Sequence, residues 1–124
     1  MRVLIVDDSS FIREFTRQQL EWLGAVCAEA VDGRDALDTL ERDDAFDLML
    51  VDLNMPRLNG LDCIRGVREA GLGGKMKVMM VTTEADYTII EQALEFGADE
   101  FLMKPFTPQG LREKLMMVGF DLAA

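Results

Sequence analysis

The sequence predicts an α/β fold in which a five-stranded parallel sheet carries helices on both faces. Short apolar runs alternate along the chain with longer stretches whose apolar residues recur every three or four positions. Strands buried on both faces of a parallel sheet give continuous apolar runs, and the crossovers between them are usually helices. The apolar runs occupy residues 2–6, 25–30, 47–51, 77–81 and 100–103. Five (β/α) units in a doubly wound arrangement follow.

The helical stretches fall between these runs. They are expected at residues 9–23, 33–41, 60–70, 85–96 and 107–118. In the first of them, Ile12, Phe15, Leu20 and Leu23 have the spacing of one helical face. Each stretch is long enough to return the chain to the start of the next parallel strand.

Residues at the helix ends support these boundaries. Gly24, Gly71 and Gly97 follow helical stretches at positions where a left-handed cap is common. Pro108 stands at a first-turn position after Thr107, which is a suitable N-cap. We therefore expect a single domain over residues 1–124, without an appended output domain.

Bulk composition excludes several function classes. The 124 residues include 23 acidic and 13 basic ones, which gives a net charge of −10, so direct nucleic-acid binding is not expected. The chain has neither a signal peptide's apolar segment nor a run of membrane-spanning length, which favours a cytoplasmic protein without membrane insertion. Cys27 and Cys63 lack metal-type spacing and are expected to be free thiols.

Polar residues collect where the predicted strands end. The carboxyl ends of parallel strands meet at one edge of the sheet, so residues far apart in sequence converge there. The residues concerned are Asp7 and Asp8 after the first strand, Asp52 after the third, Thr82 after the fourth and Lys104 after the fifth.

This combination is typical of phosphoryl chemistry at a metal. Crowded carboxylates repel one another unless a cation is present, and oxygen ligands suit Mg²⁺. Asp52 is then the best-placed nucleophile, while Lys104 and Thr82 stabilise charge on the transferring oxygens. Singly, these residues are equally well explained as helix caps or solvated side chains, so the prediction depends on the set. The chain has no histidine, which removes the commonest general base.

Four segments resemble the receiver domain of two-component response regulators, especially the stand-alone chemotaxis type. They are residues 3–9 (VLIVDDS), 47–56 (DLMLVDLNMP) with Gly60, 81–82 (VT) and 98–106 (ADEFLMKPF). The resemblance covers essentially the whole chain and implies the flavodoxin-like strand order 2-1-3-4-5. Pro105 resembles the cis-proline of that family, although the sequence alone leaves the isomer open.

The resemblance also implies roles for individual residues. Asp52 would be the phosphoacceptor; Asp8, Asp52 and the backbone carbonyl of Asn54 would bind Mg²⁺, and Asp7 would assist through water. Thr82 and Lys104 would contact the phosphoryl oxygens. The side chains of Asn54 and Glu84 would tune the lifetime of the phosphoryl group.

A switch and its partners follow from the same resemblance. A sensor histidine kinase, a phosphotransfer protein or a small phosphodonor would supply the phosphoryl group, which the protein would hydrolyse itself without turning over an external substrate. Movement of Thr82 and Phe101 would then rearrange a partner-binding face. The protein is expected to be a monomer. That face would comprise Tyr87, Ile90, Leu94, Phe101, Met103 and Lys114.

Four alternatives compete with this interpretation. A phosphorelay intermediate would use the same residues and differ only in its downstream partner. A haloacid-dehalogenase-like phosphatase would carry its nucleophile after the first strand, whereas here the acidic pair comes first. A flavodoxin-like cofactor carrier would need a phosphate loop where Asp7 and Asp8 stand. A receiver-like binding protein that is not phosphorylated would not need the complete acidic, threonine and lysine set.

Overall fold

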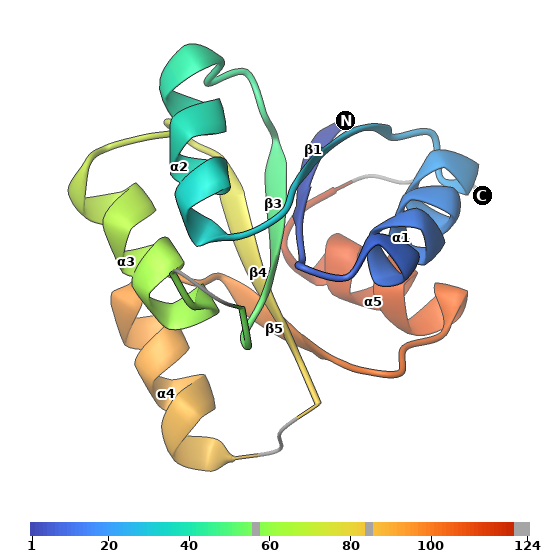
Figure 1. Cartoon of the computed structure of the whole chain (residues 1–124). Coiled ribbons are helices and arrows are strands. Elements are labelled where there is room, and N and C mark those ends of the chain that lie inside the picture. Colours follow the sequence, from blue (N-terminus) through green and yellow to red (C-terminus); the bar gives the residue numbers. More distant parts are fainter. Residues whose placement is uncertain (56–57, 84–85, 121–124) are drawn as a thin grey trace.

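The computed structural model describes residues 1–55, 58–83 and 86–120 (Figure 1). The strands are β1 (Arg2–Val6), β2 (Val26–Ala30), β3 (Leu48–Asp52), β4 (Lys77–Thr82) and β5 (Glu100–Met103). The helices are α1 (Ser10–Trp22), α2 (Gly33–Arg42), α3 (Gly60–Glu69), α4 (Tyr87–Phe96) and α5 (Pro108–Met117). No helix of these described ranges combines the length and apolar character needed to cross a membrane.

All strand pairs are parallel, and their order is β2-β1-β3-β4-β5. This order confirms the doubly wound fold expected from the sequence. Most predicted boundaries shift by one or two residues, and residue 85, the expected start of the fourth helix, lies outside the described residues. Asp52 and Thr82 were expected just after their strands but are the last residues within them, because Asp52 still pairs with Val81 and Thr82 with Met103.

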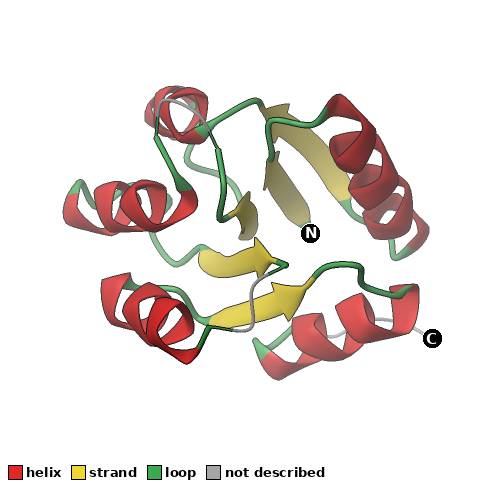
Figure 2. Ribbon diagram, turned by 60° about the horizontal axis from the view of Figure 1, so that its bottom comes forward, coloured by secondary structure: helices red, strands yellow, loops and turns green. Residues whose placement is uncertain are grey.

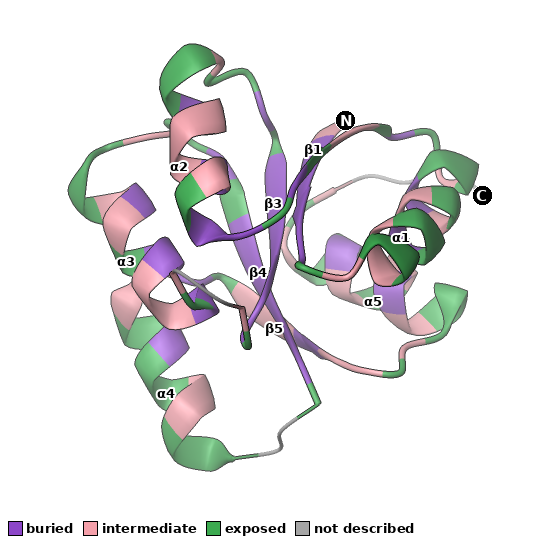
Figure 3. Cartoon of the chain, viewed as in Figure 1, coloured by how far each residue is buried: buried purple, intermediate pink, exposed green. Residues whose placement is uncertain are grey.

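Helices cover both faces of the sheet (Figure 2), and the labels of Figure 1 identify α1 and α5 on one side and α2, α3 and α4 on the other. Successive side chains along a strand point to opposite faces of the sheet, so the core has two halves, one on each face. Val3, Ile5, Leu48 and Leu50 pack with the α1 and α5 residues, whereas Leu4, Val6, Met49 and Val51 pack with those of α2, α3 and α4. The central strands are therefore buried on both faces (Figure 3).

Side-chain caps fix where the helices begin at the carboxyl edge of the sheet. The Ser9 hydroxyl accepts a hydrogen bond from the backbone N–H of Ile12 at the start of α1. Thr107 caps α5 with Pro108 in its first turn, as expected. Gly97 ends α4 with φ 116°, a left-handed conformation that glycine adopts without a Cβ penalty.

Both cysteines are free thiols, as the sequence analysis expected. Burial raises the pKa of Cys27 from an ordinary 9.0 to about 11, so its thiolate is about 100-fold scarcer in the native protein than in the unfolded chain. We therefore expect iodoacetamide at pH 8 to alkylate Cys27 about 100-fold faster in urea than in native buffer. A mass-spectrometric time course measures both rates, and equal rates would show that Cys27 is not shielded.

Candidate functional site

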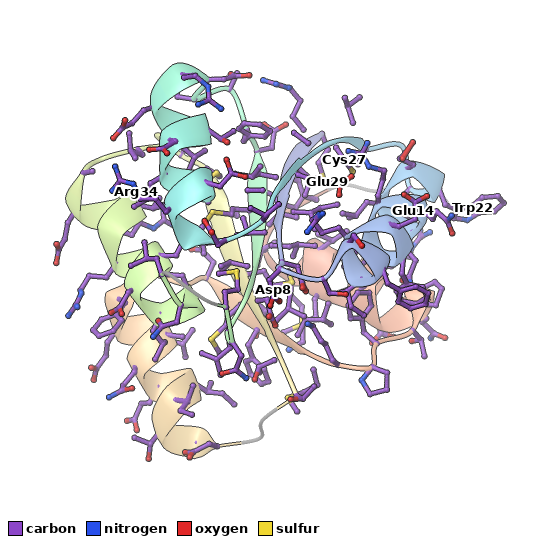
Figure 4. The ribbon with its side chains drawn as sticks, in the orientation of Figure 1. Asp8, Glu14, Trp22, Cys27, Glu29 and Arg34 are labelled. Atoms are coloured by element: carbon purple, nitrogen blue, oxygen red, sulfur yellow. The ribbon has the colours of Figure 1, made fainter. Side chains whose placement is uncertain are left out.

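Strand alternation brings the predicted site residues to the same side of the sheet. Asp7 continues the side of β1 that carries Val3 and Ile5, and Asp52 continues the side of β3 that carries Leu48 and Leu50. The register pairs Val6 with Val51, so the residues that follow them, Asp7 and Asp52, lie side by side on neighbouring strands. Asp8, the next residue along the chain, is exposed at the centre of this edge (Figure 4).

Lys104 joins the two buried aspartates. Its ammonium donates hydrogen bonds to Asp52 Oδ1 at 2.8 Å and to Asp7 Oδ2 at 3.0 Å. Its backbone N–H donates to the carbonyl oxygen of Thr82 at 2.8 Å, which places the end of β4 beside the lysine. The Lys104–Pro105 peptide bond is cis, which answers the question that the sequence left open.

One ammonium contacts two of the three clustered carboxylates, and the pKa values of Asp52 and Lys104 reflect this arrangement. Burial raises the pKa of Asp52 and outweighs the opposing hydrogen bond and charge of Lys104, while Asp7 and Asp8 raise it further. Burial alone would lower the pKa of Lys104, but its hydrogen bonds to Asp52 and Asp7 prevail and raise it. The site therefore holds a fixed lysine cation and surplus negative charge.

The three carboxylates form a candidate cation site. One carboxylate oxygen from each of Asp7, Asp8 and Asp52 lies within 4.8 Å of the other two. Two of these side chains are buried and one is exposed, which leaves one side of the cluster open to water. Hard oxygen ligands with room for water are the donor set that Mg²⁺ prefers, so the residues present fit this ion.

Asp7 is held by contacts that the sequence analysis missed. Its Oδ1 accepts the backbone N–H of Ser9 at 2.9 Å, and its carbonyl oxygen accepts a hydrogen bond from Arg13 at 2.7 Å. Arg13 also pairs with Glu29 of β2. The sequence does contain a signal for these contacts. Glu29 stands two residues after Cys27 and so shares the side of the strand that faces α1, where Arg13 and Arg17 are spaced by four.

The remaining predicted site residues have different surroundings. Thr82 is buried, with only 1% of its surface exposed, and the neighbouring Thr83 is exposed. Asn54 is exposed two residues beyond Asp52. Glu84, predicted to tune the phosphoryl lifetime, lies outside the described residues.

The predicted partner face is only partly exposed. Tyr87 and Leu94 of α4 are 80% and 46% exposed, whereas Ile90 and Phe101 are partly buried against the core on the α2, α3 and α4 side. Met103 lies with Phe101 in a hollow of ≈ 370 Å³ between β5 and α5.

Lys114 covers the aromatic ring of this face. Its ammonium lies 4.4 Å from the Phe101 ring centroid and 3.1 Å from Glu100 Oε1, so it combines a cation–π contact with an ion pair. The same Glu100 oxygen accepts the backbone N–H of Phe101. Phe101 is therefore held between the core and a paired lysine.

Replacing Lys104 with alanine is expected to lower the free energy of unfolding in metal-free buffer at pH 7. The loss should be about 2 kcal/mol, below that of a fully buried pair, because the Lys104 side chain is 17% exposed. Protonation of Asp52, whose pKa is raised, removes the need for the ammonium, so the loss should shrink as the pH falls toward that pKa. At the alkaline end, the stabilisation by Lys104 is lost as the pH rises through the lysine's raised pKa.

Urea unfolding of the parent and the variant at pH 7 and at about pH 4 measures this difference, since an ordinary aspartate titrates near the lower value. Lys75→Ala, in an exposed turn, is the matched control and should behave as the parent. An equal loss at both pH values would contradict the assigned pairing.

Comparison with known proteins identifies the family. The model of the response regulator receiver domain matches residues 3–116. A chemotaxis protein CheY homolog of Campylobacter jejuni is 39% identical over 116 residues, which cover 93% of this chain and 89% of the relative.

Solved structures agree with the sequence relatives. Chemotaxis protein CheY4 of Vibrio cholerae superposes with a TM-score of 0.87 at 33% identity, covering 94% of this chain and 97% of that one. The receiver domain of the sensor histidine kinase PA1611 from Pseudomonas aeruginosa, solved with a magnesium ion coordinated in its active-site cleft, has a TM-score of 0.83 at 27% identity and covers 94% of both chains. The chain belongs to the response regulator receiver domain family and is a phosphoacceptor signalling protein of that family.

Proposed function

We propose that Asp52 is the residue that accepts the phosphoryl group and that Mg²⁺ is required for the transfer. The observation that carries this proposal is the bridge from Lys104 to Asp52 and Asp7 within the acidic cluster. Asp8, Asp52 and the backbone carbonyl of Asn54 would hold the ion directly, and Asp7 would assist through water. The magnesium in the PA1611 receiver domain supports the choice of ion.

The residues of the chain have distinct roles in the transfer. A carboxylate oxygen of Asp52 forms the new O–P bond, and the bond between phosphorus and the donor's leaving group breaks with its electron pair passing to that group. The Lys104 ammonium and the Thr82 hydroxyl offset charge on the phosphoryl oxygens. When bound, Mg²⁺ supplies further charge neutralisation. Hydrolysis of the aspartyl phosphate by water then resets the protein, with Asn54 and Glu84 tuning its rate.

The output would be a change in the surface formed by α4, β5 and α5. Phosphorylation would draw Thr82 toward the phosphoryl group and turn Phe101 further inward, away from the Lys114 ammonium that now covers it. A downstream protein would then read Tyr87, Ile90, Leu94, Met103 and Lys114 together with the moved ring. Because residue 101 is phenylalanine, this recognition would not involve a tyrosine hydroxyl.

Membership of the receiver family supports a proposal for the partners and the cellular location. A sensor histidine kinase or phosphotransfer protein would supply the phosphoryl group in the cytoplasm, and the chain would act as a monomer that catalyses only its own phosphorylation and dephosphorylation. The similarity to CheY proteins supports chemotaxis signalling ahead of the phosphorelay alternative. The haloacid-dehalogenase-like alternative is set aside, because the chain belongs to the receiver family.

Incubation with acetyl phosphate and Mg²⁺ tests the proposed function. The intact mass is expected to rise by one phosphoryl group, and EDTA is expected to abolish the gain because the acidic cluster then lacks its counter-ion. Intact-protein mass spectrometry with and without EDTA makes the measurement. A gain that persists in EDTA would overturn the metal requirement.

A further inference from the structure

We propose that Arg13 is a positioning residue for the cation site, acting through the peptide group that joins Asp7 to Asp8. This inference deepens the proposed function and rests on it. The Arg13 side chain is only 14% exposed, and its two hydrogen bonds reach two different segments of the chain. One nitrogen donates to the carbonyl oxygen of Asp7 at 2.7 Å and another donates to Glu29 Oε1 at 2.8 Å.

The carbonyl that Arg13 holds determines how Asp8 leaves β1. A peptide group is planar, so fixing the Asp7 carbonyl oxygen also fixes the direction from which the Asp8 backbone starts. Asp8 is exposed, in contrast to the buried Asp7 and Asp52. Arg13 therefore limits the orientations from which the exposed carboxylate can join the other two.

Asp7 provides the rigid side of this arrangement. Its backbone N–H donates to the Ala30 carbonyl at 3.2 Å, its Oδ1 accepts from Ser9 and its Oδ2 accepts from Lys104. With the Arg13 contact added, hydrogen bonds fix both the backbone and the carboxylate of Asp7. The freedom that remains at the acidic pair belongs mainly to Asp8, and Arg13 acts at the peptide that restricts it.

Glu29 keeps the guanidinium in place. Figure 4 shows Glu29 beside α1, and its carboxylate binds Arg13 through Oε1 and Arg17 through Oε2, each at 2.8 Å. Burial would raise the pKa of Glu29, but the hydrogen bonds and charges of the two arginines lower it, so it stays ionised at neutral pH. The planar guanidinium fork can serve Glu29 and the Asp7 carbonyl simultaneously, which a lysine ammonium on its flexible stem does less well.

Arg17 provides a matched control on the same helix. It lies one turn after Arg13, binds the same glutamate at the same distance and pairs with Glu21 at 3.8 Å. Within the described residues, Arg17 pairs with Glu29 and Glu21 and not with Asp7. A loss of general packing between α1 and β2 should therefore appear in both arginine variants, whereas a loss of site positioning should appear only in the Arg13 variants.

The test is a calorimetric titration of Mg²⁺ into the parent protein, Arg13→Ala, Arg13→Lys and Arg17→Ala, with urea unfolding of each variant in metal-free buffer. Arg13→Ala is expected to bind Mg²⁺ about tenfold more weakly than the parent. Removing a residue that hydrogen-bonds to the surroundings of a metal ligand typically lowers metal affinity by at least this factor. Arg17→Ala should stay within about twofold. Arg13→Lys keeps the charge but has a single donor nitrogen in place of the guanidinium fork, so its Mg²⁺ affinity should fall between those of the two alanine variants.

Phosphorylation by acetyl phosphate gives a second readout. The rate for Arg13→Ala should be reduced at limiting Mg²⁺ and should recover at saturating Mg²⁺, which a general folding defect would not produce. Equal Mg²⁺ affinities for the folded Arg13 and Arg17 variants would overturn the inference, and Arg13→Lys provides the comparison if Arg13→Ala does not fold. A parent protein that binds Mg²⁺ without becoming phosphorylated would instead contradict the proposed function.

Discussion

Asp52→Ala is expected to gain no phosphoryl group from acetyl phosphate and Mg²⁺ under conditions that modify the parent protein completely. The reason is chemical, because the variant lacks the carboxylate oxygen that forms the O–P bond. Burial and two neighbouring carboxylates raise the pKa of Asp52, and Lys104 holds one of its oxygens at 2.8 Å. The other acidic residues of the site, Asp7 and Asp8, remain in the variant, so a mass gain that persists would place the acceptor outside Asp52.

Two further variants make the result specific. Asp47→Ala removes a carboxylate just before the opposite end of β3, where it accepts the backbone N–H of Arg2 at 2.7 Å, and should be phosphorylated as the parent is. Asp52→Asn keeps the volume of the side chain and should be at least as stable as the parent without metal, because the buried negative charge is gone. Intact mass and urea unfolding report these properties. A phosphoryl group on Asp52→Asn would disprove the assignment of the acceptor.

Gly60→Ala is expected to have the largest effect on stability among substitutions near the site. A Cβ at Gly60 would overlap the carbonyl oxygen of Asp52 and would lie 2.8 Å from the Cα of Leu53. Both are backbone atoms, so the start of α3 would have to move away from the end of β3. We expect the free energy of unfolding to fall by about 3 kcal/mol and phosphorylation to slow as Asp52 is displaced.

Gly66→Ala is the matched control within the same helix. Its added Cβ would meet Leu37 Cδ1 at 3.4 Å, which is ordinary contact with a flexible side chain. Alanine also has the higher helix propensity, so this variant should be unchanged or more stable by up to about 1 kcal/mol. Urea unfolding compares the two variants, and equal stability would show that the close approach at Gly60 is not a constraint.

The fold and the convergence of the site follow from local patterns in the sequence. Continuous apolar runs predict strands buried on both faces, and polar residues at their carboxyl ends must then meet at one edge. This reasoning brings Asp7, Asp52 and Lys104 together, and their contacts in the structure agree with it. The strand order itself came from the family resemblance, because alternating helices and strands do not fix which strand lies at the edge.

Other features depend on tertiary geometry that sequence patterns do not encode. The link from Glu29 through Arg13 to the Asp7 carbonyl needs the register between α1 and β2, which the spacing of apolar residues leaves undetermined. The apolar members of α4 could not be divided into exposed and packed ones, because the helix's rotation against the sheet was unknown. In the structure, the rotation of α4 leaves Tyr87 exposed and packs Ile90 partly against the core.

The most direct test of the central claim is to locate the phosphoryl group on the chain. Borohydride reduction of an aspartyl phosphate leaves homoserine at the modified position, and peptide mass spectrometry then identifies it. After treatment with acetyl phosphate and Mg²⁺, we predict homoserine at position 52 alone, and none when EDTA is present. Homoserine at Asp7 or Asp8, or a phosphorylated protein without homoserine, would contradict the account.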